Sequence, residues 1–206
     1  MATRLLSPGW GPSGISPFRF ATLKIYTRKG DDGTTGLLYG GRVAKDSPRI
    51  EANGAVDEAQ AALGLARAEA DPGSELDELL VRLERELYVL MAEVATDSSN
   101  RHKLDPGRSL VTVEMVAVLE SDIDRITERF EMPKEFVVPG HGRASAALDV
   151  ARTIVRRAER LAGAPDLAEA GSSVGPYLNR LSDLLWTMAR WQEGEHLASR
   201  TGKAIP

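Results

Sequence analysis

The residues at positions 27–36 are those whose types and spacing most directly suggest chemistry. Their run, TRKGDDGTTG, holds three glycines, three threonines, two acids and two bases. Glycines at this density oppose a core strand or a regular helix, because glycine loses the most chain entropy when it is ordered. A loop of this kind can bring backbone N–H groups close to an anion, helped by basic side chains and hydroxyls. The run matches neither GxxxxGK(S/T) nor GxGxxG, and a plain glycine-rich hairpin turn is the alternative.

A second candidate is a row of charged side chains in the segment RTIVRRAERLAG, which begins at Arg152. At helical spacing, Arg152, Arg156, Glu159 and Arg160 share one face, and Arg157 lies to the side. Arginine offers fixed, paired donors to phosphate, so this face could clamp a polyanion. The alternative is a solvated basic face on a surface helix.

A third candidate lies in VGPYLNRLSDLLWTMARWQ, where Asn179, Asp183, Trp186 and Arg190 fall on one helical face. Asparagine is unfavourable in the middle of a helix, so one placed there often has a partner. The alternative is a surface network of asparagine, aspartate and arginine.

Two acids, Asp57 and Glu58, stand among small residues in GAVDEAQAALG. Small residues allow another helix or subunit to approach closely, and an acid there could pair with one of the arginines. An ordinary exposed acid is the alternative. The three histidines, His102, His141 and His196, have no metal-ligand spacing, and no Ser/His/Asp arrangement can be argued.

The elements that must position these residues are helices. Apolar residues recur at helical spacing, and turn or capping signals such as Asp71-Pro72-Gly73 and the following SELD interrupt them. The expected helices cover residues 50–70, 74–96, 112–130, 144–162 and 174–197. Between them lie a polar loop at 97–109 and a connector at 132–142 that contains FVV. With almost no strand signal, the sequence predicts an all-α bundle of five helices.

Composition limits the function classes. The chain has 206 residues, 26 bases, 30 acids and a net charge of −4, which argues against a nucleic-acid scaffold. No apolar run approaches the roughly 18 residues that span a bilayer, so no membrane role is expected. There is no cysteine, which excludes disulfides, thiolate metal sites and cysteine nucleophiles and fits a reducing cytoplasm.

Two parts of the chain differ in composition. Residues 1–21 are rich in proline and glycine and lack acids, so we expect a flexible N-terminal tail, with an organelle transit segment as the alternative. Residues 22–200 are expected to form the helical domain.

Together these segments resemble the PduO-type ATP:cob(I)alamin adenosyltransferases. Four blocks carry the resemblance in the family's order and span most of the chain after the tail. They are TRKGDDGTTG at 27–36, RVAKDSPRIEANGAVDEAQAALG at 42–64, FVVPG at 136–140 with ARTIVRRAER at 151–160, and YLNRLSDLLWTMAR at 177–190. One departure is His141, where the family commonly has a second glycine after the proline of FVVPG.

The resemblance implies a trimer of five-helix, ferritin-like bundles with sites between subunits. It implies transfer of the 5′-deoxyadenosyl group of ATP to the Co(I) of cobalamin, with Mg²⁺ carried on the ATP phosphates. It assigns ATP to Thr27, Arg28, Gly30, Asp31, Gly33, Thr34, Thr35 and Lys45, completed by the catalytic residues Arg156, Glu159 and Asn179, with Arg157 and Arg160 as further candidates. It assigns the lower face of cobalamin to Phe136 with Val138, and an intersubunit pair to Asp57 and Arg152.

The resemblance also implies partners. Cob(II)alamin must be reduced by an external reductase, and the product is used by an adenosylcobalamin-dependent enzyme. The rival function is a non-catalytic sensor or carrier of nucleotide or corrinoid on the same bundle. A nucleotide-binding loop alone would suit that rival equally, whereas the aromatic connector and the Arg/Glu/Asn set favour the enzyme.

Overall fold

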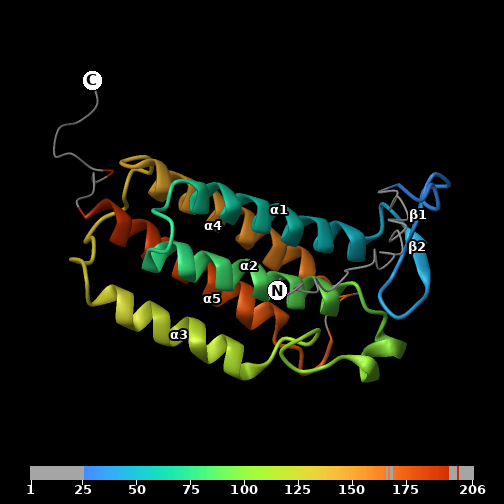
Figure 1. Ribbon diagram of the computed structural model, residues 1–206. Coiled ribbons are helices and arrows are strands. Elements are labelled where there is room, and N and C mark those ends of the chain that lie inside the picture. Colours follow the sequence, from blue (N-terminus) through green and yellow to red (C-terminus); the bar gives the residue numbers. More distant parts are fainter. Residues whose placement is uncertain (1–25, 166, 168, 195–198, 200–206) are drawn as a thin grey trace, which may run out of the picture.

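The computed structural model describes residues 26–165, 167, 169–194 and 199 and shows a bundle of long helices with a small hairpin at one end (Figure 1). The hairpin strands are β1 (Thr34–Gly36) and β2 (Arg42–Ala44). The helices are α1 (Pro48–Ala68), α2 (Glu75–Val94), the 3-10 helix η1 (Ser98–Lys103), α3 (Val113–Thr127), α4 (Arg143–Ala162) and α5 (Val174–Glu193). The expected N-terminal tail lies outside the described residues.

The helical fold predicted from the sequence is confirmed, with three corrections. The described residues contain six helices rather than five, because the expected polar loop after α2 includes η1, which Asp97 caps through the Ser99 amide. Two short strands form although the sequence carries almost no strand signal, which agrees with the hairpin alternative for residues 27–36. Helix α5 ends at Glu193 instead of near residue 197, since Gly194 takes a φ of 65°, which ends the helical path.

Local signals explain where the helices begin. Ser74 accepts a hydrogen bond from the Asp77 amide at the start of α2, and Thr112 accepts one from the Met115 amide at the start of α3. Helix α1 begins with Pro48, whose missing N–H costs nothing in the first turn. These signals fix where each helix begins, whereas its apolar stripe determines the face that it turns inward.

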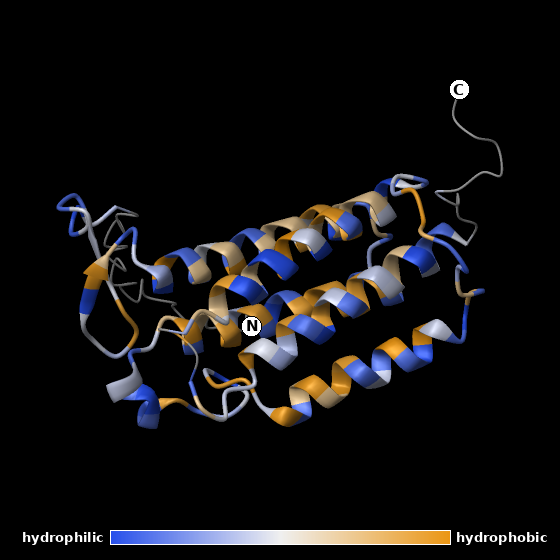
Figure 2. Cartoon of the chain, turned by 180° about the vertical axis from the view of Figure 1, so that it is seen from behind, coloured by the Kyte–Doolittle hydropathy of each residue, from blue (hydrophilic) through white to orange (hydrophobic). Residues whose placement is uncertain are grey.

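The core forms where the apolar stripes of the helices meet. Helix α4 packs against both α1 and α5, α2 packs against α1, and α3 packs against α5. Apolar and polar residues alternate around each helix, as expected for amphipathic helices in a bundle (Figure 2). Within this core, buried Tyr177 donates its hydroxyl to Glu86 at 2.6 Å. Burial raises the pKa of Tyr177 well above its ordinary value, with the Glu86 charge adding to the effect, so the hydroxyl remains a donor.

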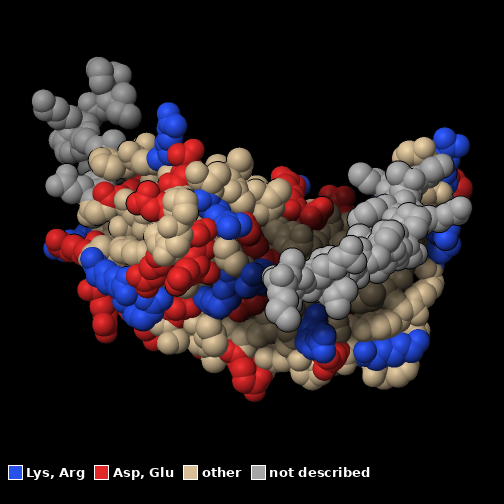
Figure 3. All heavy atoms as spheres, in the orientation of Figure 1, with Lys and Arg blue, Asp and Glu red and all other residues tan. Residues whose placement is uncertain are grey.

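Ion pairs join the helices on the outside of the bundle. They include Arg82 with Asp122, Arg129 with Glu75 at 2.5 Å, and Arg67 with Asp77 at 2.7 Å. On the face shown in Figure 3, basic and acidic side chains lie intermingled. No helix in the described part of the chain is both long enough and apolar enough to cross a membrane.

The candidate segments lie at the two ends of the bundle. The hairpin lies beyond the start of α1, whereas the connector between α3 and α4 lies at the opposite end (Figure 1). Helix α4 has 20 residues, so at 1.5 Å per residue it separates the two ends by about 30 Å.

Candidate functional site

The glycine-rich segment forms the turn and first strand of the hairpin, so the hairpin alternative is confirmed, and binding of an anion by this segment stays a prediction. Thr34 pairs with Ala44 and Gly36 with Arg42 across the two strands. Gly33 has a φ of +82°, a backbone conformation that strongly favours glycine. A side chain at Gly30 would come within 3.0 Å of the Thr34 carbonyl oxygen and 3.1 Å of the Lys45 side chain. The hairpin therefore needs glycine at both places, and Lys45 lies directly over Gly30.

A charged network fixes the shape of the hairpin. Asp32 accepts hydrogen bonds from the Thr34 amide at 2.9 Å and the Thr34 hydroxyl at 2.8 Å. Arg42 bonds to the same hydroxyl and to the Lys29 carbonyl oxygen at 2.6 Å. The bond from the Thr34 amide, followed by that from the hydroxyl, lowers the pKa of the Asp32 carboxyl. These bonds within the hairpin are joined by one to the end of α2, where the Leu38 amide donates to the Ala95 carbonyl oxygen at 2.9 Å.

Asp32 and Arg42 were missed as contributors to this segment. Their signal was an aspartate two residues before a threonine, which is the spacing of a local side-chain turn. The hydroxyl of Thr34, a residue expected to bind ATP, donates to Asp32 and accepts from Arg42 within the hairpin. Other expected ligands remain accessible, since Arg28, Asp31 and Lys45 are exposed.

A second polar cluster joins α4 to α5. The Asn179 amide nitrogen donates to Glu159 at 2.9 Å, and its amide oxygen accepts from Arg180 at 2.6 Å. Arg180 also donates to Glu120 of α3 at 2.9 Å. Arg156 lies one turn before Glu159 and is exposed, with its guanidinium unpaired within the described residues. Glu159 and Asn179, proposed from the sequence to share a site, therefore lie in direct contact, with a free cationic side chain beside them.

The third helical face predicted from the sequence is only partly a surface. Asn179 and Asp183 lie at the surface, but Arg190 is buried and bonds to Asp149 at 2.6 Å. The interpretation of Arg190 as part of a surface network is wrong, because Asp149 on the facing helix supplies a carboxylate inside the bundle.

Asp57 and Arg152 do not meet within one chain. Asp57 is exposed on α1, and Arg152 lies near Asp149 of its own helix at 3.4 Å. The neighbouring acid does pair with an arginine, since Glu58 bonds to Arg157 and ties α1 to α4. Any pairing of Asp57 with Arg152 therefore requires a second chain.

The aromatic connector is open to solvent. Phe136 is 85% exposed and Val138 is 41% exposed, so neither plugs the end of the core. Phe136 lines a hollow of about 520 Å³ together with Trp186 of α5 and Val137. The amide of Ser199 donates to the Phe136 carbonyl oxygen at 2.7 Å and closes one side. Trp186 was assigned no ligand from the sequence, and only the tertiary packing places it here.

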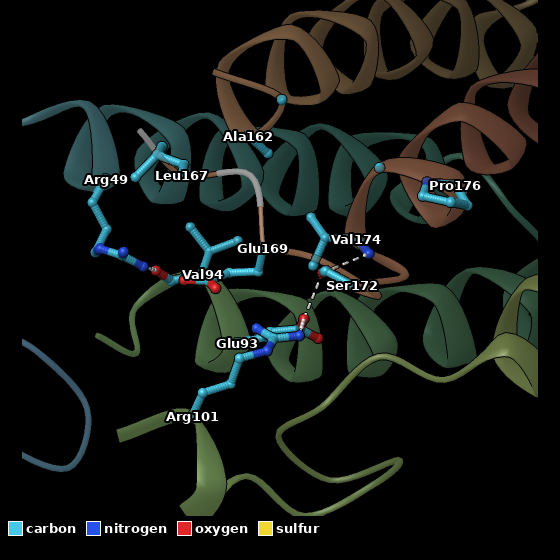
Figure 4. Close-up of a pocket in the computed structure, with 12 residues that line it drawn as sticks. Arg49, Glu93, Val94, Arg101, Ala162, Leu167, Glu169, Ser172, Val174 and Pro176 are labelled. Carbon is cyan, nitrogen blue, oxygen red and sulfur yellow. Dashed lines mark hydrogen bonds and ion pairs between the residues drawn. The ribbon is translucent and has the colours of Figure 1, made fainter. Parts of the chain in front are cut away.

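The smaller cavity in Figure 4 is a different kind of feature. It encloses about 170 Å³ near the hairpin end, between α2 and the start of α5. Its buried Glu93 accepts from Arg101 at 2.5 Å, from Ser172 at 2.6 Å and from the Val111 amide at 2.7 Å. Arg49 donates to two backbone oxygens at the end of α2. Glu93 and Arg49 thus already have hydrogen-bond partners inside the protein. Their bonds join the loops to the bundle and leave few free polar groups for a ligand.

The profile of one protein family, described as cobalamin adenosyltransferase, matches residues 25–192. The chain belongs to this family. A corrinoid adenosyltransferase from Citrobacter freundii is 42% identical over 171 residues, which cover 82% of this chain and 95% of that protein. The corrinoid adenosyltransferase PduO of Salmonella typhimurium is 39% identical over 180 residues, and the match covers 84% of this chain but 51% of that longer protein.

Solved structures of the family have the same fold. A PduO-type ATP:corrinoid adenosyltransferase from Lactobacillus reuteri, in a variant with phenylalanine replaced by histidine and complexed with cobalamin and ATP, superposes with a TM-score of 0.74. It is 30% identical, and the match covers 82% of this chain and 91% of that one. A second variant, with arginine replaced by lysine, was solved with ATP and is 28% identical, with a TM-score of 0.76 and coverage of 85% and 100%.

The hairpin network yields a pH-dependent prediction. Because the folded state lowers the pKa of Asp32, its contribution to hairpin order is complete above the pKa of the unfolded chain, about 4. That contribution is lost as the pH falls through the lowered pKa. The protection of the Lys45 amide, which donates to the Gly33 carbonyl oxygen at 2.9 Å, should therefore fall on acidification, measured as its exchange rate relative to the intrinsic rate of an unstructured amide at the same pH.

The substitution Asp32→Ala should produce the same loss of protection at neutral pH. Asp31→Ala is the matched control, because the Asp31 side chain makes no hydrogen bond within the described residues, and should leave the Lys45 amide protected. Equal protection in both variants would show that the Asp32 network does not order the hairpin.

Proposed function

We propose that this chain catalyses ATP-dependent adenosylation of cobalamin. The observation that carries the proposal is the family match, which spans all the segments that hold the candidate residues. Its relatives are named corrinoid adenosyltransferases, and its structural neighbours bind cobalamin and ATP. The Co(I) centre attacks C5′ of ATP with its electron pair and forms the cobalt–carbon bond. The C5′–oxygen bond breaks, and triphosphate leaves with that bond's electrons.

In this reaction no covalent bond to the protein needs to form or break. Cob(I)alamin is already a strong nucleophile, so no side chain need act as nucleophile or base. The protein must hold C5′ in line with cobalt and stabilise the charge that develops on triphosphate. Lys45, Arg28 and the exposed Arg156 are suited to the phosphates, and the bonded pair of Glu159 and Asn179 is suited to fixing the nucleotide. Magnesium would arrive on the phosphates of ATP and neutralise part of their charge.

The spacing of two candidate residues supports their roles. The Lactobacillus reuteri variants replace a phenylalanine and an arginine that are 20 positions apart. Phe136 and Arg156 are separated by the same number of positions, 156 − 136 = 20. The equal spacing supports the equivalence of Phe136 and Arg156 to those two positions, and we propose a phosphate role for Arg156 and a corrinoid role for Phe136. Trp186, which lines the same hollow as Phe136, joins this corrinoid assignment.

The separation of the two ends supports a shared site. The hairpin and the connector that carries Phe136 lie at opposite ends of one bundle, separated by the length of α4, about 30 Å, yet the carbon of ATP must bond to cobalt. We therefore place each site between the hairpin of one chain and the α4 and α5 surface of another. A trimer closes such head-to-tail contacts into a ring, and Asp57 with Arg152 would join neighbouring chains.

Two partners complete the proposed cycle. A reductase must supply the electron that converts Co(II) to Co(I), and an adenosylcobalamin-dependent enzyme uses the product. We place this exchange in the cytoplasm, where reducing conditions suit a chain without cysteine.

The rival is a bundle that binds nucleotide or corrinoid without reacting them. Anaerobic incubation of the chain with ATP, Mg²⁺ and chemically reduced cobalamin separates the two. Adenosylcobalamin and triphosphate should form in equal amounts, whereas binding without product would establish the sensor or carrier.

For the phosphate role, Arg156→Ala should lower the rate of adenosylation by about 10²–10³-fold, the usual effect of removing one preorganised donor to developing charge. Arg156 is exposed, so the fold should persist in circular dichroism. Arg143→Ala is the control, because Arg143 is also exposed but begins α4 at the other end. Near-native turnover in Arg156→Ala would remove Arg156 from the site.

For the corrinoid role, Phe136→Ala should affect the reaction from Co(II) more strongly than that from supplied Co(I). Without the apolar ring over the lower face, an axial ligand returns to cobalt and makes reduction harder. Cob(II)alamin bound with ATP should then lose its four-coordinate spectrum, while ATP affinity is retained. A four-coordinate spectrum that survives in the variant would contradict this assignment.

For assembly, Asp57→Ala should shift the trimer toward smaller species in analytical ultracentrifugation. In the proposed trimer the contact between chains would bury this pair, and removing one partner of a buried ion pair costs about 3–5 kcal/mol. Asp71→Ala, in the loop after α1, serves as the control for loss of one exposed acid. An unchanged trimer with unchanged ATP affinity would show that Asp57 is an ordinary surface acid.

A further inference from the structure

Helix α5 carries a charge inside the bundle that the proposed reaction does not use. The Arg190 side chain is 2% exposed and lies between two acids that are also buried, Asp149 of α4 and Glu193 of α5. Its Nη2 donates to Asp149 Oδ2 at 2.6 Å and to Glu193 Oε1 at 3.1 Å. These are the only buried charges within the described residues that join α4 directly to α5.

This arrangement is not the most stable way to fill the space. Burying charges costs free energy that their attraction often fails to recover, and apolar residues of similar size commonly pack as well or better. The geometry here is also imperfect. Arg190 Nε and Glu193 Oε2 lie 2.9 Å apart, yet neither atom makes an aligned hydrogen bond. Stability alone therefore does not explain why a charged residue stands at position 190.

Arg190 touches the wall of the corrinoid hollow. Its guanidinium carbon lies 5.6 Å from the centre of the Trp186 ring, within the range of a cation–π contact. Trp186 is the α5 residue that lines the hollow with Phe136. The Asp149 carboxylate accepts a hydrogen bond from the same guanidinium. The carboxylate therefore fixes the position of Arg190, and Arg190 in turn supports the Trp186 indole.

The Asp149 carboxylate also contacts a second arginine, on the outer side of α4. Its second oxygen, Oδ1, lies 3.4 Å from Nε of Arg152, the residue that we place at the contact between chains. One carboxylate thus joins an interior arginine, which supports the aromatic wall, to a partly exposed arginine on the outer side of α4.

We propose that Arg190, held by Asp149, is a positioning residue that sets the orientation of Trp186 in the corrinoid site. The proposal rests on the proposed function for the identity of the ligand, but the contact between Arg190 and Trp186 can be tested without it. In this arrangement Asp149 and Arg190 act through Trp186 and touch neither ATP nor cobalamin.

Kinetics of the full chain test the role. Asp149→Asn and Arg190→Lys should each raise KM for cobalamin by about tenfold, the scale expected for loss of a contact that couples neighbouring residues. KM for ATP should stay within about twofold. The control is Tyr177→Phe, which removes a buried hydrogen bond from the same helix but far from Trp186 along it, and should leave both KM values near native. Equal changes in both KM values, or none, would overturn the proposal.

A double-mutant cycle separates positioning from general destabilisation. In a Trp186→Phe background, Asp149→Asn should add little to KM for cobalamin, because the residue it acts through has already been altered. Additive effects would mean that Asp149 acts by another route.

Fluorescence provides a readout that does not depend on activity. With Trp10 and Trp191 replaced by phenylalanine, Trp186 becomes the single tryptophan of the chain. Asp149→Asn and Arg190→Lys should then shift its emission and increase acrylamide quenching, whereas Tyr177→Phe should not. If the native chain makes no adenosylcobalamin but this shift appears, the proposed function fails and the positioning role stands. If the chain is active and Trp186 is unaffected, only the positioning role fails.

Discussion

Helix α4 is packed on one side against both α1 and α5, and this double contact determines where the charged candidate residues lie. Leu148, Ala151, Val155 and Ala158 are all fully buried along that side. Because they fix the rotation of the helix, Arg156 must point outward, while Glu159 must turn toward Asn179 of α5. The chemistry of the outer face thus depends on a row of small and branched apolar residues that take no part in it.

The helices could be predicted because each carries its signal locally. The apolar period, the capping serine at Ser74 and the stop at Asp71-Pro72 lie within a few residues of what they determine. The same holds for the shared face of Arg156 and Glu159. The contact of Glu159 with Asn179 could be proposed only through the family resemblance, since 20 residues and a loop separate them.

What could not be predicted depends on partners distant in sequence. Arg190 looked exposed by helical period, and only the facing Asp149, 41 residues earlier, explains its burial. Trp186 likewise becomes part of a hollow only because the connector with Phe136, 50 residues earlier in the chain, lies beside it. The hairpin was one of two alternatives for its segment, but its strands could not be predicted, for another reason. Its strands have three residues each and their pairing depends on Asp32 and Arg42, so the alternating pattern of a longer strand is absent.

The distance between the hairpin and the aromatic connector has a genetic consequence. If each site takes its hairpin from one chain and its α4 surface from the next, every chain holds half of two different sites. Consider a mixed trimer in which one chain is damaged only in the hairpin and its neighbour only at Arg156. Both defects then fall in the same site between chains, and another site of the trimer stays intact. Two inactive alleles of this kind would therefore restore part of the activity when expressed together, whereas two alleles damaged in the same half would not.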